Sequence, residues 1–142
     1  MTRGRRGGLR LDVLAVAVAA LVNERYLDPR FTLGELSKEL RVALFVLRRR
    51  FTRFYGLTLD EHLALRRIEL ATLLMESSPY RLGGLELVAR RSGYPGVGAL
   101  DRDFLRYRRV PVLAAWLRMA SSRSASPGES QGDALLLAGR GT

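Results

Sequence analysis

The sequence lacks several residues on which enzymes and metal sites depend. None of its 142 residues is cysteine, and His62 is the only histidine. The absence of cysteine excludes disulfides, thiolate metal ligands and cysteine nucleophiles. A lone histidine cannot build a usual zinc site, and no nucleophile–base pair is visible among the serines. No glycine-rich loop follows a strand pattern. We therefore expect no enzyme, no metal and no cofactor.

A run of apolar residues long enough to cross a membrane is also absent. The longest run, Val13–Val22, has ten residues, whereas a span needs about 18–20. Four arginines precede it, as in a signal peptide, but Asp12 lies at its edge and no small-residue cleavage site follows. We expect a buried first helix in a cytoplasmic protein that has no membrane partner.

The charge is strongly unbalanced toward basic residues. There are 24 lysine and arginine residues against 14 aspartate and glutamate, a net charge of +10, and Lys38 is the only lysine. Abundant arginine is typical of GC-rich genomes. Arginine forks also match phosphate oxygens and guanine edges. A basic chain of this size most often binds nucleic acid and less often anionic lipid.

The apolar spacing predicts an all-α fold with no strands. Thr32 with Glu35, and Thr58 with Glu61, have the spacing of capping boxes, and Gly56 is placed to end a helix. We expect Trp116 to fill the core and His62 to pack. The predicted helices cover about Leu9–Arg25, Leu33–Leu40, Leu44–Phe54, Leu59–Met75, Leu85–Arg91, Val97–Tyr107 and Val112–Ala120.

The spacing also predicts which side of each helix is buried. In the first helix Leu11, Leu14, Val18 and Leu21 recur at helical intervals. The corresponding stripe of the long middle helix is Leu63, Ile68, Ala71 and Leu74, with Arg66 and Arg67 beside it.

One unit occurs twice: a short helix, a turn, and a helix that ends in an aromatic core residue. The copies are Leu33–Phe54 and Leu85–Tyr107, and the long middle helix joins them. This is the organisation of two helix-turn-helix modules, resembling homeodomain bundles, on a linker helix. We divide the chain into a flexible basic arm (1–8), first module (9–58), linker helix (59–77), second module (78–120) and disordered tail (121–142).

The second helix of each unit carries the candidate DNA-binding residues, since an exposed helix fits the major groove of double-stranded DNA. Arg48 or Arg49 could pair with guanine, Phe45 could pack on a thymine methyl or a sugar, and Arg50 is expected to be solvated or to face phosphate. We expect most specificity from the first module and mainly affinity from the second. The candidates are Phe45, Arg48, Arg49, Arg53, Val97, Gly98, Ala99, Arg102 and Arg106.

Two plainer interpretations of these arginines stay open. Arg48–Arg50 could be a solvated charge run, and Arg102 could be ion-paired with Asp101, Asp103 or Glu86.

The pattern resembles the DNA-binding domain of the AraC/XylS family of bacterial transcription regulators, over about residues 9–118. The resemblance implies a sequence-specific regulator that contacts DNA through Arg102 and activates through RNA polymerase. Because the residues before the first module are too few to enclose a ligand cavity, we expect no sensor domain in this chain, and we expect it to bind DNA as a monomer. The resemblance rests on Leu33, Leu36, Leu40, Leu47, Arg49, Phe51, Gly56, Arg67, Ile68, Ala71, Leu73, Leu74, Val88, Ala89, Gly93, Tyr94, Leu100, Arg102 and Phe104.

Some positions depart from the family pattern. Arg41 and Arg109 stand where a glycine is usual, Ser37 replaces an alanine, and Ala43 replaces a serine N-cap. The loop before Leu85 is about three residues longer than usual. These departures leave two alternatives: a protein-interaction module whose DNA reading has decayed, or a non-specific nucleoid or RNA-binding protein.

Overall fold

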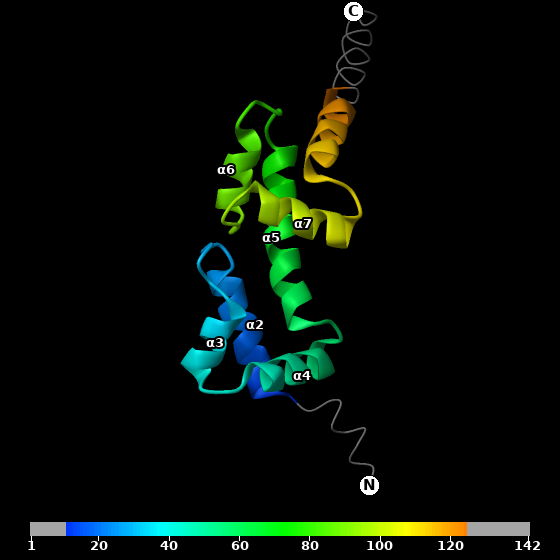
Figure 1. The fold of residues 1–142 in the computed structure, drawn as a ribbon. Helices are drawn as coiled ribbons and strands as arrows, with labels where there is room; N and C mark the ends of the chain where they lie inside the picture. The colour runs from blue at the N-terminus through cyan, green and yellow to red at the C-terminus, as the bar shows by residue number, and fades with distance from the viewer. Residues whose placement is uncertain (1–10, 125–142) are drawn as a thin grey trace, which may run out of the picture.

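The computed structural model describes residues 11–124, and within this range every regular element is a helix (Figure 1). A last helix covers residues 112–124. The preceding helices are α2 (Val13–Arg25), α3 (Leu33–Leu40), α4 (Leu44–Tyr55), α5 (Leu59–Glu76), α6 (Gly84–Arg91) and α7 (Val97–Arg108). The predicted all-α fold class is confirmed.

The helices form two groups around the long helix α5 (Figure 1). Helices α2, α3 and α4 surround its first half, and α6, α7 and the last helix surround its second half. Each group has its own apolar core. Leu36, Leu47 and Phe51 are central to the first core, and Leu100, Phe104 and Trp116 are central to the second. Helix α5 contributes to both cores and therefore connects two separately packed modules.

Side-chain caps explain why three of the helices begin where they do. The Asp12 carboxylate accepts a hydrogen bond from the Ala15 N–H at 3.1 Å. The Thr32 hydroxyl accepts one from the Glu35 N–H at 3.2 Å, and Thr58 accepts one from Glu61 N–H at 3.0 Å. These bonds confirm both predicted capping positions and satisfy donors that a helix start leaves free.

The buried face of α2 agrees only in part with the predicted one, because Val18 is buried and Leu14 and Leu21 pack partly buried against the first core. Helix α2 buries Ala15, Val18, Ala19 and Val22, whereas Leu11 is 62% exposed. A helix that is apolar on nearly every side has no single stripe that periodicity can identify. Ala15 and Ala19 face inward, and α4 packs against α2.

Helix α5 and the last helix also differ in detail from the prediction. Leu63 and Leu74 are only half-buried, and Arg67, expected beside the buried stripe, is itself buried. Residues 121–124, expected in the tail, continue the last helix. The arm (1–8) and residues 125–142 lie outside the described residues. Trp116 is 2% exposed, which confirms its place in the core.

Among residues 11–124, no helix combines the length and apolar character that a membrane crossing requires.

Candidate nucleic-acid interface

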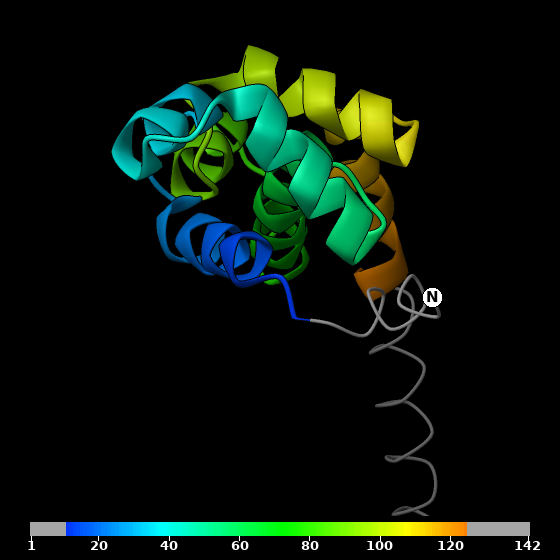
Figure 2. The same ribbon diagram turned by 90° about the horizontal axis from the view of Figure 1, so that it is seen from below.

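The two candidate recognition helices, α4 and α7, have similar orientations. Both run from left to right in Figure 1, so that their N-terminal ends lie on the same side. Seen from below, both lie on one side of α5 (Figure 2). In helix-turn-helix proteins the N-terminal residues of this helix contact base edges. The two helices are thus placed to approach one elongated partner together.

The outer side of α4 exposes the predicted residues of the first module. Phe45 is 66% exposed, and the Arg49 guanidinium lies over its ring, 5.8 Å from the centroid. Arg48 and Arg53 are also exposed, while Leu47 and Phe51 are buried on the opposite side. The outward orientation of the four candidates is therefore confirmed, and their contact with DNA stays a prediction.

Two arginines of α4 are already engaged by carboxylates. Arg48 donates two hydrogen bonds to Asp60 of α5, at 2.9 and 3.0 Å. Arg50 donates two to Asp12, at 3.1 and 2.9 Å. Asp12, which caps α2, therefore holds Arg50 beside it, although the Arg50 side chain is still 43% exposed. That Arg50 faces phosphate stays a prediction. Asp60 is a neighbour of the site that sequence reasoning missed.

The outer side of α7 is less uniform. Arg102, Arg106 and Gly98 are exposed, whereas Val97 and Ala99 are half-buried and pack on the core of the second module. Val97 and Ala99 therefore have less surface available to a base than the sequence suggested.

The predicted alternative of an ion pair for Arg102 has no support among residues 11–124. Asp101 accepts a hydrogen bond from the Val112 N–H at 2.9 Å, and Asp103 accepts one from the Tyr94 hydroxyl at 2.9 Å. Glu86 lies 3.7 Å from Arg90. Each carboxylate that could have held Arg102 thus contacts a different group.

A groove of about 460 Å³ connects the two modules. Arg48 of α4 lines it from one side, Arg106 of α7 lines it from the other, and Arg67 of α5 lies between them. Asp60 and Asp103 also line it. Predicted residues of both modules therefore face one shared space, which places them on the same side of the molecule.

Neither recognition helix has a side-chain cap at its start. The N-cap residues are Ala43 for α4 and Gly96 for α7, and neither accepts a hydrogen bond from the helix. Backbone N–H groups at such helix starts are available to anions, and the helix dipole favours phosphate there.

Two departures from the family pattern have a visible backbone effect. Arg41 ends α3 with φ +58°, and Arg109 ends α7 with φ +64°. Both residues adopt the left-handed conformation that favours glycine. The turns therefore keep the geometry that a glycine would adopt there, with an arginine in its place.

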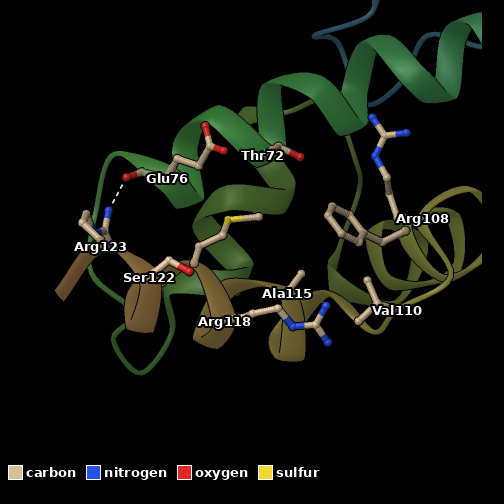
Figure 3. Close-up of a pocket in the computed structure, with 10 residues that line it drawn as sticks. Thr72, Glu76, Arg108, Val110, Ala115, Arg118, Ser122 and Arg123 are labelled. Carbon is tan, nitrogen blue, oxygen red and sulfur yellow. Dashed lines mark hydrogen bonds between the residues drawn. The ribbon is translucent and has the colours of Figure 1, made fainter. Parts of the chain in front are cut away.

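A pocket of about 690 Å³ lies away from the candidate DNA-binding residues, between α5, the inner side of α7 and the last helix (Figure 3). Phe104, Val110, Ala115 and Met119 contribute its apolar walls. None of the nine candidate DNA-binding residues lines it.

Solved structures share this fold. The DNA-binding domain of AdpA, a global transcriptional factor solved in complex with a target DNA, is 23% identical, with a TM-score of 0.64, 79% of this chain covered and 97% of that chain. The C-terminal domain of AraT, a response regulator from Geobacillus stearothermophilus, is 18% identical (TM-score 0.66; 80% and 88% covered). The C-terminal domain of the two-component response regulator yesN from Fusobacterium nucleatum is 22% identical (TM-score 0.61; 73% and 94% covered).

These similarities confirm the predicted fold, two helix-turn-helix modules on a linker helix. No protein-family model matches the chain, and no curated protein matches it.

Proposed function

We propose that this protein is a sequence-specific regulator of transcription of the AraC/XylS type, which binds double-stranded DNA through α4 and α7. The observation that carries the proposal is the common placement of the two helices on one side of α5, with Arg48 of the first module and Arg106 of the second lining one groove. Successive major-groove segments on one face of B-DNA lie about 34 Å apart. Because one chain carries both helices, a single copy suffices to contact two such segments.

The electrostatics of this side support the same conclusion. The chain has a net charge of +10. Arg49, Arg53, Arg102 and Arg106 have no ion-pair partner within the described range. Such arginines can form forked bonds to guanine or to phosphate, and the uncapped helix starts add backbone donors for phosphate. Binding of this kind releases counterions and weakens steeply with salt.

We assign different roles to the two helices. Helix α4 offers Phe45 in its first turn and Arg49 one turn later, an apolar ring and a forked donor side by side. Those are groups that distinguish thymine and guanine in the major groove. Helix α7 carries Arg102 at the same position along the helix as Arg49 in α4, and Arg106 one turn later, but its first turn has only small exposed groups and no counterpart of Phe45. We therefore assign most base reading to the first module and mainly affinity to the second.

The test is selection of genomic fragments at physiological salt, followed by gel shifts of the selected fragments with Arg49→Ala and Arg102→Ala. Arg90→Ala, on α6, is the matched control, because it removes the same charge away from α4 and α7. We expect enrichment of a defined site, weaker binding by both variants and near-parent binding by the control.

Two other outcomes would replace the proposal. Equal affinity for unrelated duplexes, unchanged in the variants, would indicate non-specific nucleic-acid binding. Binding that shows no salt dependence, together with a stable protein partner, would indicate an interaction module. For specific binding, the logarithm of affinity should fall by about 0.9 per phosphate neutralised for each tenfold rise in salt.

A further inference from the structure

The buried guanidinium of Arg67 joins parts of the molecule that are distant in sequence. The Arg67 side chain leaves the middle of α5 and is only 9% exposed. Its Nε donates to the Tyr26 carbonyl at 2.8 Å, and one terminal nitrogen donates to the Asp28 and Phe31 carbonyls at 3.1 and 3.4 Å. These three carbonyls belong to the turn between α2 and α3. One side chain of the linker helix therefore holds the turn of the first module.

The same guanidinium contacts the second module. It lies over the ring of Tyr94, 5.7 Å from the centroid, in the turn between α6 and α7. Tyr94 is 2% exposed, and its hydroxyl donates to Asp103 of α7 at 2.9 Å. A continuous series of contacts thus leads from the first module through Arg67 and Tyr94 to the second recognition helix. We call this series the Arg67 bridge.

Beside the Arg67 bridge, the backbone at Gly93 lies so close to Tyr26 that there is no room for a side chain. A Cβ atom on Gly93 would lie 2.1 Å from the Tyr26 carbonyl oxygen and 2.9 Å from the Arg67 Nε. Gly93 also has φ +99°, which favours glycine. The turns of the two modules therefore meet directly, as their neighbouring positions in Figure 1 show.

The chemistry of Arg67 suits a fixed junction. Burial lowers the pKa of Arg67, with Tyr94, Asp103 and Asp28 acting in the opposite direction, and a guanidinium remains charged in proteins. No carboxylate forms an ion pair with it among residues 11–124, so backbone carbonyls provide its polar contacts. A planar fork can satisfy three carbonyls with a defined orientation, and a lysine ammonium on a flexible stem cannot reproduce this.

We propose that Arg67 is a positioning residue that fixes α7 relative to α4 and thereby sets the spacing between the two DNA segments that the protein accepts. The part that concerns DNA rests on the proposed function. The part that concerns the two helices does not, and it can be measured without DNA.

Spin labels test the position of the helices directly. The chain has no cysteine, so Thr52→Cys on α4 and Leu105→Cys on α7, both exposed, would be the only labelling sites. We expect one narrow distribution of label–label distances in the otherwise unchanged protein and a broader or shifted one after Arg67→Lys. Arg90→Lys is the charge-conserving control and should leave the distribution unchanged.

DNA spacing gives the second readout. On duplexes whose two segments are moved apart by one to three base pairs, Arg67→Lys should lose about tenfold of the preference for the best spacing. A folded Arg67→Lys protein with the original distances and the original preference overturns the proposal. Altered distances without any specific DNA site would support the role of Arg67 and contradict only the proposed function.

If Arg67→Lys does not fold, a milder variant tests the positioning role of Arg67. Tyr94→Phe keeps the ring against Arg67 and removes only the hydrogen bond to Asp103. It should broaden the distribution of label–label distances less than Arg67→Lys does. Circular dichroism would confirm that the helices are intact. Where it is the only folded variant, unchanged distances overturn the proposal.

Discussion

The two modules share one plan but equip their recognition helices differently. Helix α4 carries Arg48, Arg49, Arg50 and Arg53, whereas α7 begins with Val97, Gly98 and Ala99 and its candidate arginines are Arg102 and Arg106. Two of the four arginines of α4 are held by Asp60 and Asp12. The comparison teaches that the number of arginines on a helix overstates the number that are available to a partner. When the two paired arginines are left out, each helix offers two candidate arginines that are unpaired among the described residues.

The modules differ in their cores as well. The first module closes around Phe51 of its own recognition helix. The second needs Trp116 from the last helix, whose indole packs against Tyr80 and Gly84. A Cβ on Gly84 would lie 2.8 Å from the indole, so this contact needs glycine. The second module therefore depends on a segment that comes after its helix-turn-helix unit.

The largest expected effect is a loss of stability when the last helix no longer supplies Trp116 to the second module. Trp116→Ala removes a buried indole and the bond that its N–H donates to the Ser78 carbonyl at 3.0 Å. We expect the free energy of unfolding to fall by about 3–5 kcal/mol in denaturant titrations. Trp116→Phe keeps most of the volume and should lose less. Near-parent stability of Trp116→Ala would show that the last helix is dispensable to the second module.

The second prediction separates the roles of the two recognition helices. Arg49→Ala and Arg102→Ala should each weaken binding to the selected site by about 1–3 kcal/mol, or roughly 5- to 150-fold. Only Arg49→Ala should also reduce the discrimination between the selected site and single-base variants. Gel shifts against a panel of such variants measure both quantities. Greater loss of discrimination in Arg102→Ala would reverse the assignment of roles.

A smaller effect is expected where arginine occupies a left-handed turn in each module. Arg41→Gly and Arg109→Gly relieve a conformation that costs a residue with a Cβ atom, partly offset by the greater freedom of glycine when unfolded. We expect a gain of about 0.5–1 kcal/mol for each variant, seen as a rise in Tm of roughly 2–4 °C. Gly56→Ala, at φ +83°, should act in the opposite direction. A lower Tm in both arginine variants would mean that the arginine side chains stabilise these turns.

Asp60→Asn tests whether the ion pair with Asp60 keeps Arg48 of α4 from contacting DNA. The Arg48–Asp60 pair is about half-exposed, so its loss should change stability by less than about 1 kcal/mol. Removing a negative charge beside the proposed DNA surface should strengthen binding about threefold at low salt. Glu86→Gln, which removes the same charge from α6, is the control. Weaker binding by Asp60→Asn would instead show that Asp60 orients Arg48 for a base.

The smallest effect concerns pH and comes from His62 of α5, which packs against Phe51 of the first module. Burial lowers the pKa of His62 below its ordinary value of 6.5, and its buried Nε2 has no partner among the described residues. The unfolded chain therefore takes up the proton first, and stability should fall as the pH decreases through 6.5 toward the folded pKa. Asp12, Asp28 and Glu39, whose pKa values are lowered, act only in a more acidic range. His62→Phe should flatten the unfolding free energy between about pH 7.5 and 5.5. A slope that persists in that variant would contradict this assignment.

Much of the fold could be predicted from local signals. The Thr32 and Thr58 caps, the glycine at position 56 and the apolar spacing of α3 and α4 each depend on residues within one or two turns of helix. The full buried face of α2 could not be predicted in this way, because valine, alanine and leucine lie on nearly every side of this apolar helix. Its orientation follows from the packing of α4.

The site was harder to predict than the fold for a related reason. Exposure of Phe45 and Arg49 follows from helical periodicity, but the partners of Arg48 and Arg50 lie on other helices. Arg67 has the spacing of a buried residue, three positions after Ala64 and four before Ala71, yet its charge suggested the surface. Only the turn carbonyls that it bonds, far away in sequence, explain its burial.

The most direct test of the account is a high-resolution footprint of the protein on its selected DNA site. We predict two protected major-groove segments on one face of the duplex, separated by about 10–10.5 base pairs, with Arg49→Ala weakening one and Arg102→Ala the other. A single protected segment, or two on opposite faces, would contradict the claim that α4 and α7 read DNA together.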